Sequence, residues 1–257
     1  MLVCYDPYVG TLGRFPRNEI IKMVAKAGYE GINLPIRDPF IDVNNEGQIE
    51  ETEKLLAKYN LSVPSVGFGN HIVTTPSLQE ETLQHFRIVL RIARRMKSRI
   101  ISIWPNQPQD VYVEDALETL TINLREMLPE VSKFGIAIAL EFEKGSPLDN
   151  YVQSIGFINA TDNRIRLTCD THHLNNYKAD PYRSVIAMGD LLADVHISGS
   201  HRGEPGSEGD VFDYESFMKG LADIGYNGPL TLQYHLKDVD SIARACAFTK
   251  SLRDKVS

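Results

Sequence analysis

The sequence predicts an α/β fold, a parallel eight-stranded (β/α)₈ barrel that forms a single domain over residues 1–257. Eight short aliphatic and β-branched segments alternate with eight longer segments of helical period along the whole chain. The length of 257 residues matches the roughly 250 residues that such a barrel requires. No G-x-G-x-x-G or P-loop glycine pattern follows the first segment, which disfavours the alternative, an open doubly wound sheet.

Strands and helices are expected to follow one another in strict order. The expected strands are Leu2–Tyr5, Gly31–Leu34, Ser62–Val66, Ile100–Trp104, Ile136–Phe142, Arg166–Asp170, Asp194–Ile197 and Leu230–Tyr234. The expected helices are Asn18–Ala27, Gly47–Tyr59, Leu78–Met96, Val113–Lys133, Asn150–Asn159, Pro181–Met188, Tyr214–Ile224 and Asp240–Lys255. Similar Gly-Tyr-x-Gly turns at 28–31 and 225–228 precede the second and eighth strands, as expected of one repeated unit.

Composition and charge exclude several classes of protein. Acidic residues outnumber basic ones by 34 to 27, and this net charge of −7 argues against nucleic-acid and membrane-surface partners. The three cysteines are widely spaced, so neither a disulfide framework nor a zinc knuckle is expected and a reducing compartment fits best. Without a visible secretory signal or an unbroken apolar stretch of membrane-spanning length, the sequence predicts a cytoplasmic protein.

Four polar side chains end consecutive predicted strands. Glu141 follows Ala139-Leu140, Asp170 follows Thr168-Cys169, and His196 and Gln233 end the seventh and eighth strands. Functional groups of a parallel barrel gather at the carboxyl ends of its strands, so these side chains are expected at one rim. Two carboxylates, an imidazole and an amide oxygen suit one divalent ion: Mn²⁺ is expected, with Co²⁺, Mg²⁺ or Zn²⁺ as alternatives.

Three further residues are candidates for the same pocket. His71 follows the third strand and is either a proton donor or a surface-loop histidine. Trp104 ends the fourth strand, where it either fills the core or stacks on the C–H face of a sugar. Glu143 shares the face of Glu141 by the period of two along a strand, so it contacts either substrate or solvent.

The segments that carry these residues resemble the xylose isomerase-like barrel superfamily, which includes ketose 3-epimerases, hydroxypyruvate isomerase, inositol-catabolism enzymes and endonuclease IV. The similarity covers Ala139-Leu140-Glu141, Cys169-Asp170-Thr171-His172-His173, Asp194-Val195-His196-Ile197 and the closing stretch from Ala222 to Leu230. The resemblance implies that Glu141, Asp170 and His196 bind a metal, that His173 and Arg202 contact the substrate, and that the protein is a dimer or a tetramer.

Gln233 departs from the sugar epimerases of that superfamily, which have a glutamate at this position. An amide oxygen can still coordinate a cation but cannot accept a proton, whereas two-base epimerisation uses two carboxylates. The expected function is isomerisation or epimerisation of a keto sugar or keto-glycoside through an enediolate, with Glu141 as base and His173 or His71 as proton donor. β-Elimination from a 3-keto sugar or glycoside needs only one base and is the close alternative.

Two other functions must be compared with this one. The chain is either an enzyme or a catalytically silent barrel subunit in which Gln233 marks lost chemistry. Endonuclease IV-like DNA repair is disfavoured, because Trp104-Pro105 ends the fourth strand and no Asp-x-His sequence follows His196 to complete a trinuclear zinc site.

Overall fold

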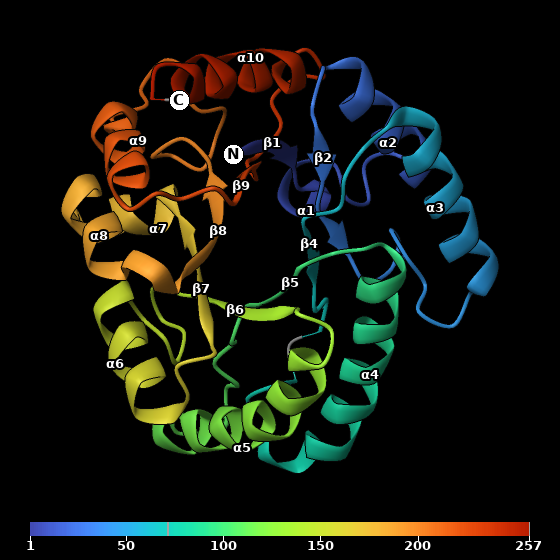
Figure 1. Ribbon diagram of the computed structural model, residues 1–257, viewed down its shortest axis with the longest axis vertical. Helices are drawn as coiled ribbons and strands as arrows, with labels where there is room; N and C mark the ends of the chain where they lie inside the picture. The colour runs from blue at the N-terminus through green and yellow to red at the C-terminus, as the bar shows by residue number, and fades with distance from the viewer. Residues whose placement is uncertain (71, 257) are drawn as a thin grey trace.

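The computed structural model describes residues 1–70 and 72–256 and has a parallel sheet at its centre, surrounded by helices (Figure 1). The strands are β1 (Leu2–Tyr5), β2 (Gly31–Ile32), β3 (Leu34–Pro35), β4 (Ser65–Gly67), β5 (Ile100–Ile103), β6 (Ala137–Glu141), β7 (Arg166–Asp170), β8 (Leu192–Ile197) and β9 (Pro229–Leu232). Their order in the sheet is β2-β1-β9-β8-β7-β6-β5-β4-β3, with parallel pairing throughout. Only Asn33 separates the two outermost strands, β2 and β3, along the chain, so the sheet nearly closes into the predicted barrel.

The predicted helices form the outer layer. They are α2 (Arg17–Lys26), α3 (Glu46–Tyr59), α4 (Gln79–Arg95), α5 (Val113–Ser132), α6 (Tyr151–Thr161), α8 (Pro181–Met188), α9 (Tyr214–Asp223) and α10 (Ser241–Asp254). Short helices that the sequence did not predict are α1 (Pro7–Gly10), α7 (Thr171–Asn176) and the 3₁₀ turns η1 (Pro76–Leu78) and η2 (Gly189–Leu191). Both α1 and α7 begin where a strand ends, and each has an aspartate as its N-cap. Asp6 directly follows β1 and Asp170 is the last residue of β7, and their side chains accept hydrogen bonds from the backbone of the next turn.

The predicted boundaries hold to within three residues. The strands at Leu2–Tyr5 and Arg166–Asp170 and the helix at Pro181–Met188 have the predicted bounds. The main difference lies at the second strand, which is split at Asn33 because its first half pairs with β1 and its second half with β4. Ser62 lies outside β4 and forms only an isolated bridge to Gly31.

The barrel interior below the site is polar. Ser102 of β5 and Thr168 of β7 lie 3.3 Å apart at their hydroxyl oxygens, although β6 separates their strands, so both point into the barrel. Asn33 likewise reaches Thr231 of β9 across β1, at 3.3 Å. Parallel barrels more commonly fill these layers with Val, Ile and Leu, so this interior is available for function rather than for packing alone.

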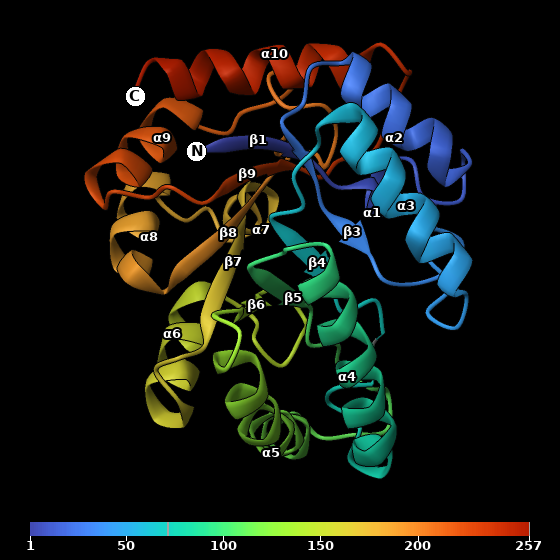
Figure 2. The ribbon, with the colours of Figure 1, turned by 45° about the vertical axis from the view of Figure 1, so that its right-hand side comes forward.

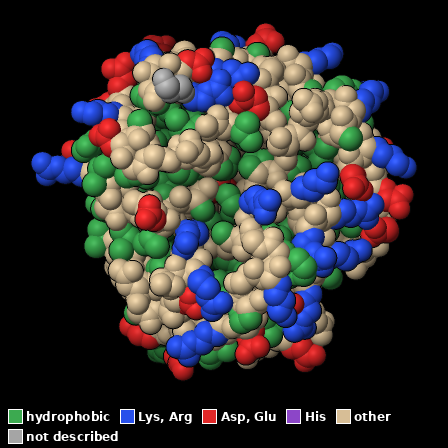
Figure 3. Space-filling view, viewed as in Figure 1, with side chains coloured by type: hydrophobic (Ala, Val, Ile, Leu, Met, Phe, Trp, Pro, Cys, Tyr) green, Lys and Arg blue, Asp and Glu red, His purple; other side chains and the backbone are tan. Residues whose placement is uncertain are grey.

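The two ends of the chain lie side by side, where α10 runs past β1 (Figure 2). Arg253 of α10 donates to the backbone oxygen of Met1 at 3.4 Å and to Glu30 at 2.8 Å. On the face shown in Figure 3, charged side chains of both signs surround a more hydrophobic centre. Among the described residues, no helix combines the length and the apolar character needed to cross a bilayer.

Candidate metal and substrate site

A cavity of about 280 Å³ opens at the carboxyl ends of the strands, near the lower end of the volumes typical of small-molecule sites. Seven of the predicted site residues line it: Trp104, Glu141, Glu143, His173, His196, Arg202 and Gln233. Asp170, the eighth, is fully buried beside it. His71, the proposed proton donor, lies outside the described residues. The structure therefore brings together every predicted site residue that it describes.

Among the described residues, Glu141, Asp170 and His173 form a cluster of potential ligands whose ligand atoms all lie within 4.8 Å of one another. Glu141 ends β6 and Asp170 ends β7, so the parallel sheet places both carboxylates at the same rim, although Glu141 is the register partner of Thr168. His173 joins them because α7 begins directly at Asp170, whose Oδ1 accepts from the backbone N–H of His172 at 2.8 Å. This short helix brings His173, which was expected to contact substrate and to donate a proton, into the group of potential ligands.

His196 reaches the same carboxylate from β8. Its Nδ1 lies 3.2 Å from Oε1 of Glu141, while Nε2 of His173 lies 3.8 Å from that oxygen. Burial lowers the pKa of His196, but the negative charges of Glu141 and Asp194 outweigh this and raise the pKa well above its ordinary value. Burial raises the pKa of Glu141, but the positive charge on His196 outweighs it, so the pKa is lowered and Glu141 stays ionised.

Arg202 links the other two predicted ligands. Its Nη1 donates to Oδ2 of Asp170, and its Nη2 donates to Oε1 of Gln233 at 2.6 Å. A tight turn holds Arg202 in a left-handed backbone conformation with φ of 63°, closed by a bond from its N–H to the carbonyl oxygen of Gly199. The four predicted ligands thus lie as two pairs, Glu141 with His196 and Asp170 with Gln233, and Arg202 joins the second pair.

The charges around Asp170 favour its ionised form. Burial raises its pKa, but the charge of Arg202, followed by those of His173 and His196, outweighs burial and holds the pKa at about 2. Both oxygens also accept hydrogen bonds, since Oδ1 receives one from Ser198 at 3.2 Å as well. Asp170 is therefore a fixed negative charge at neutral pH, as a cation ligand should be.

Two carboxyl groups of the site were not singled out from the sequence. Asp6 follows β1 and lines the cavity, and burial raises its pKa to about 6. Asp194 lies two residues before His196 on β8 and is fully buried. The period of two along a strand could have found Asp194, because it places the side chains of positions 194 and 196 on one face of β8.

Glu143 and Trp104 complete the cavity wall. Glu143 follows β6, is half-buried rather than solvated, and has a pKa raised mainly by burial. Trp104 follows β5 and lines the cavity, so its ring is not confined to the core. Both positions are compatible with the predicted contacts to a substrate.

The donor set fits a hard or borderline divalent cation. Glu141 and Asp170 supply ionised oxygens, and imidazole nitrogens of His173 and His196 lie within 3.8 Å of Glu141. Nδ1 of His173 and Nε2 of His196 are buried without a hydrogen-bond partner, so each ring keeps a nitrogen whose hydrogen-bonding capacity is unused. The cluster could hold a metal ion through its carboxylates and at least one imidazole.

Comparison with known proteins agrees with this architecture. The family model described as "Xylose isomerase-like TIM barrel" matches residues 21–252. L-ribulose 3-epimerase of Methylomonas sp. (strain DH-1) is 28% identical over 223 residues, which cover 81% of this chain and 75% of that protein.

Solved structures show the same fold at low sequence identity. D-psicose 3-epimerase from Clostridium cellulolyticum H10, crystallised with D-tagatose, superposes with a TM-score of 0.81 at 17% identity, covering 100% of this chain and 99% of the other. The 3-keto-D-glucoside 4-epimerase from E. coli gives a TM-score of 0.79 at 17% identity, covering 99% and 100%. At these identities, the structural likeness extends to the fold alone.

Proposed function

Because the chain belongs to the xylose isomerase-like TIM barrel family, we propose that it is a divalent-metal-dependent isomerase or epimerase of a keto sugar or keto-glycoside. One observation carries the proposal: the ligand atoms of Glu141, Asp170 and His173 lie within 4.8 Å of one another beside a cavity that suits a small molecule. The relatives named for ketose and keto-glucoside epimerisation support the substrate class.

The proposed ligands are Glu141, Asp170, His196 and Gln233, with Mn²⁺ as the proposed ion and Co²⁺, Mg²⁺ or Zn²⁺ as alternatives. When bound, such an ion polarises adjacent carbonyl and hydroxyl oxygens and makes the neighbouring C–H more acidic. His173 is the alternative imidazole ligand, since it belongs to the tight cluster with the two carboxylates. Arg202 must then share or release Asp170 and Gln233, both of which it now bonds.

Glu141, or a group that it positions, is proposed to take the proton from the carbon next to the carbonyl. The lowered pKa of Glu141 keeps it ionised and able to accept that proton. His173, whose Nε2 lies 3.8 Å from Glu141, is proposed to return a proton to carbon, and His71 is proposed as the other donor. Return to the adjacent carbon gives isomerisation, whereas return to the opposite face of the same carbon gives epimerisation.

The remaining lining residues are proposed to bind the substrate. The guanidinium of Arg202 can donate to hydroxyl, carboxylate or phosphate oxygens of a sugar. The carboxyl of Glu143 is placed to contact a hydroxyl, and the ring of Trp104 offers a face for the C–H side of a sugar ring.

Exchange of substrate hydrogen with solvent tests the first step. The protein with added Mn²⁺ is incubated in D₂O with free ketoses and with 3-keto-glycosides, and deuterium on carbon is followed by NMR. We expect deuterium at the carbon next to the carbonyl in at least one substrate class. No incorporation and no product across both classes would contradict the proposal.

β-Elimination from a 3-keto sugar or glycoside is the second candidate. Gln233 favours it, because its amide accepts a hydrogen bond from Arg202 and supplies no second base where the sugar epimerases have a glutamate. The same incubations separate the two reactions, since elimination releases the leaving group and forms an unsaturated ketone. A metal assay tests the third possibility: stoichiometric bound metal that is lost in Asp170→Ala favours an enzyme, and absence of bound metal favours a silent barrel subunit.

A homo-oligomer, a dimer or a tetramer, and a cytoplasmic location complete the proposal. Light scattering of the purified chain measures the first, and fractionation of expressing cells measures the second.

A further inference from the structure

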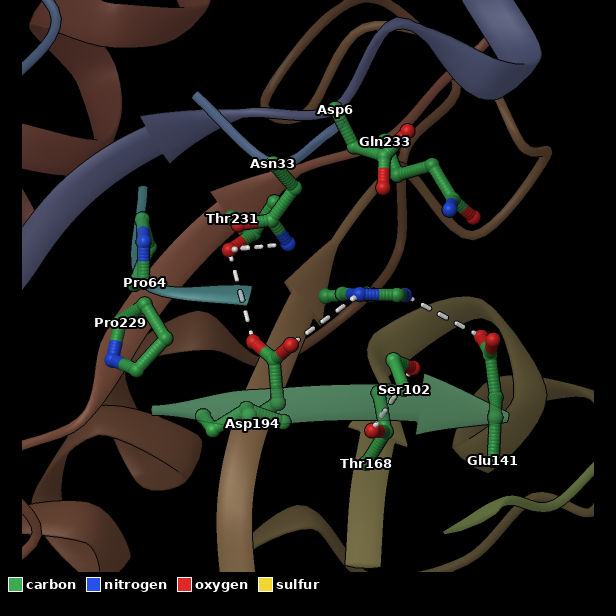
Figure 4. Close-up of polar contacts among 12 residues, drawn as sticks. Asp6, Asn33, Pro64, Ser102, Glu141, Thr168, Asp194, Pro229, Thr231 and Gln233 are labelled. Carbon is green, nitrogen blue, oxygen red and sulfur yellow. Dashed lines mark hydrogen bonds and ion pairs between the residues drawn. The ribbon is translucent and has the colours of Figure 1, made fainter. Parts of the chain in front are cut away.

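Asp194 is a buried carboxylate that the proposed reaction does not use. It lies on β8 at the inward-facing position two residues before His196, and its side chain is fully buried. Its Oδ1 accepts a hydrogen bond from the hydroxyl of Thr231 at 3.4 Å, and Thr231 in turn accepts one from the side-chain amide of Asn33 at 3.3 Å. Figure 4 shows this chain of polar contacts below the site. A fully buried carboxylate is costly unless it has partners, so its other oxygen needs a donor.

The second oxygen of Asp194 faces His196. Its Oδ2 lies 3.7 Å from Nε2 of His196, and neither atom has a hydrogen-bond partner. On the opposite side of the same ring, Nδ1 lies 3.2 Å from Oε1 of Glu141. In Figure 4 one dashed line begins at Asp194 and another at Glu141, and both run into the space between these carboxylates. The ring therefore stands between two carboxylates, one in the barrel interior and one at the proposed metal site.

The two carboxylates face different nitrogens of the His196 ring, and only one of these nitrogens can bind a cation. An ionised carboxylate accepts hydrogen bonds and cannot donate them, so the nitrogen that faces Asp194 must carry hydrogen. An imidazole that carries hydrogen at Nε2 can bind a cation only through Nδ1, which is the nitrogen beside Glu141. Histidine ligands of metals commonly donate their other N–H to a carboxylate in this way.

We infer that Asp194 is a positioning residue that holds His196 with its Nε2–H inward and its Nδ1 presented to the cation. This inference rests on the proposed function, because the cation is proposed there. Thr231 and Asn33 fix Asp194 in turn, so the orientation of His196 depends on three side chains inside the barrel.

Substitution of Asp194 tests the inference on the full-length protein. Asp194→Leu keeps the approximate shape and removes the acceptor, whereas Asp194→Asn keeps an acceptor oxygen without the charge. Thr168→Val is the matched control, since Thr168 is the register partner of Asp194 on β7, is equally buried and contacts Ser102 rather than His196. Titration calorimetry with Mn²⁺ on the metal-free proteins measures affinity.

We expect Asp194→Leu to weaken Mn²⁺ binding by about 10- to 100-fold and Asp194→Asn to weaken it less, because neutral hydrogen bonds are weaker than charge-assisted ones. Thr168→Val should bind as the wild type does. If the leucine variant does not fold, the asparagine variant decides: weakened binding supports the inference, and wild-type binding overturns it.

A second measurement separates positioning from a general structural role. In Zn²⁺-loaded protein with ¹⁵N-labelled histidine, the wild type should show a slowly exchanging Nε2–H of His196, identified by its loss in His196→Gln. Asp194→Leu should lose this signal and Thr168→Val should keep it. An unchanged signal together with unchanged affinity in both Asp194 variants overturns the inference. A wild type that binds Mn²⁺ and shows this signal but converts no keto sugar overturns the proposed function alone.

Discussion

Asp170 has several electrostatic and hydrogen-bonding roles in the site. It caps α7, accepts a hydrogen bond from Ser198 and pairs with Arg202, all while fully buried. Its negative charge is therefore expected to contribute both to cation binding and to the placement of Arg202.

Asp170→Asn keeps the shape and the capping oxygen of Asp170 but removes its charge. We expect Mn²⁺ affinity to fall by at least about 100-fold, because even outer-sphere partners of metal ligands cost 10- to 100-fold when they are lost. Calorimetry measures the affinity, and Asp213→Asn, a surface N-cap of α9, is the control. Equal affinities for Asp170→Asn and the wild type would show that Asp170 is not a ligand of the cation.

Gln233→Glu would restore the carboxylate that the sugar epimerases have at this position. If the neutral amide suppresses two-base chemistry, we expect the variant to gain free-ketose epimerisation at carbon 3, measured by chromatography of the product sugars. Gln233→Met is the companion variant, since it has similar size and no acid–base function. A glutamate variant no more active than the methionine variant would place the second base elsewhere.

The raised pKa of Asp6 is expected to make the free energy of unfolding depend on pH. Its pKa is about 6 in the folded protein and 3.8 in the absence of burial, so the folded state holds the proton more tightly. The stabilisation from this proton is complete below pH 3.8 and is lost as the pH rises through about 6. From pH 5 to pH 8 this loss amounts to roughly 1.4 kcal/mol.

Asp6→Asn should remove that loss while keeping the hydrogen bond to the backbone N–H of Tyr8. Urea denaturation of metal-free protein at pH 5 and pH 8 measures the free energy of unfolding. From pH 5 to pH 8, the free energy of unfolding of the variant is expected to rise by roughly 1.4 kcal/mol relative to that of the wild type. Parallel behaviour of the two proteins would mean that Asp6 is ionised throughout this range.

At the scale of elements, space is short at Gly31, where β2 begins beside β1. A Cβ added at Gly31 would lie 2.8 Å from the carbonyl oxygen of Ser62 and 2.9 Å from Sγ of Cys4. The backbone oxygen cannot move away without disturbing the bridge between Gly31 and Ser62. This position therefore excludes a side chain for lack of space.

Gly31→Ala is expected to lower the free energy of unfolding by about 1–3 kcal/mol, the usual cost of overpacking a core. Gly156→Ala is its counterpart, because Gly156 lies in α6 with open space around its Cβ position and should gain about 0.5–1 kcal/mol from helix propensity. Urea denaturation of both variants measures the pair, and destabilisation of the two by equal amounts would refute the steric argument.

The elements also show what the sequence can predict. The long strands and helices follow from hydrophobic period, as β7 and α8 illustrate with their predicted bounds. The helices α1 and α7 have four and six residues, too few to show a period, and each begins at an aspartate that caps it. The sequence predicted Asp170 as a possible ligand. Its second role, as the N-cap of α7, became visible only in the structure.

The candidate site was likewise predicted only in part. Strand ends predicted Glu141, Asp170, His196 and Gln233, because the architecture alone brings such positions to one rim. The bond from Arg202 to Asp170 and the approach of Asp194 to His196 depend on side-chain directions within the closed barrel, which no linear spacing encodes. His71 lies outside the described residues, so its role stays a prediction.

At the scale of the whole molecule, the cation is expected to stabilise the fold. The proposed ligands lie at the ends of β6, β7, β8 and β9, between residues 141 and 233, and the alternative ligand His173 lies in α7. A cation bound among them would join segments that separate on unfolding. A ligand that binds only the folded state at a free concentration of 100 times its Kd adds about 2.7 kcal/mol.

For a chain of this length, 2.7 kcal/mol corresponds to a rise in Tm of roughly 5–11 °C. Calorimetric scans with Mn²⁺ and with EDTA measure the difference, and Asp170→Asn should show little of it because its affinity is reduced. A rise of equal size in the variant would point to Mn²⁺ bound at surface carboxylates, which this acidic chain of net charge −7 offers in number. The variant thus separates a cation that holds the strand ends together from one that only neutralises the surface.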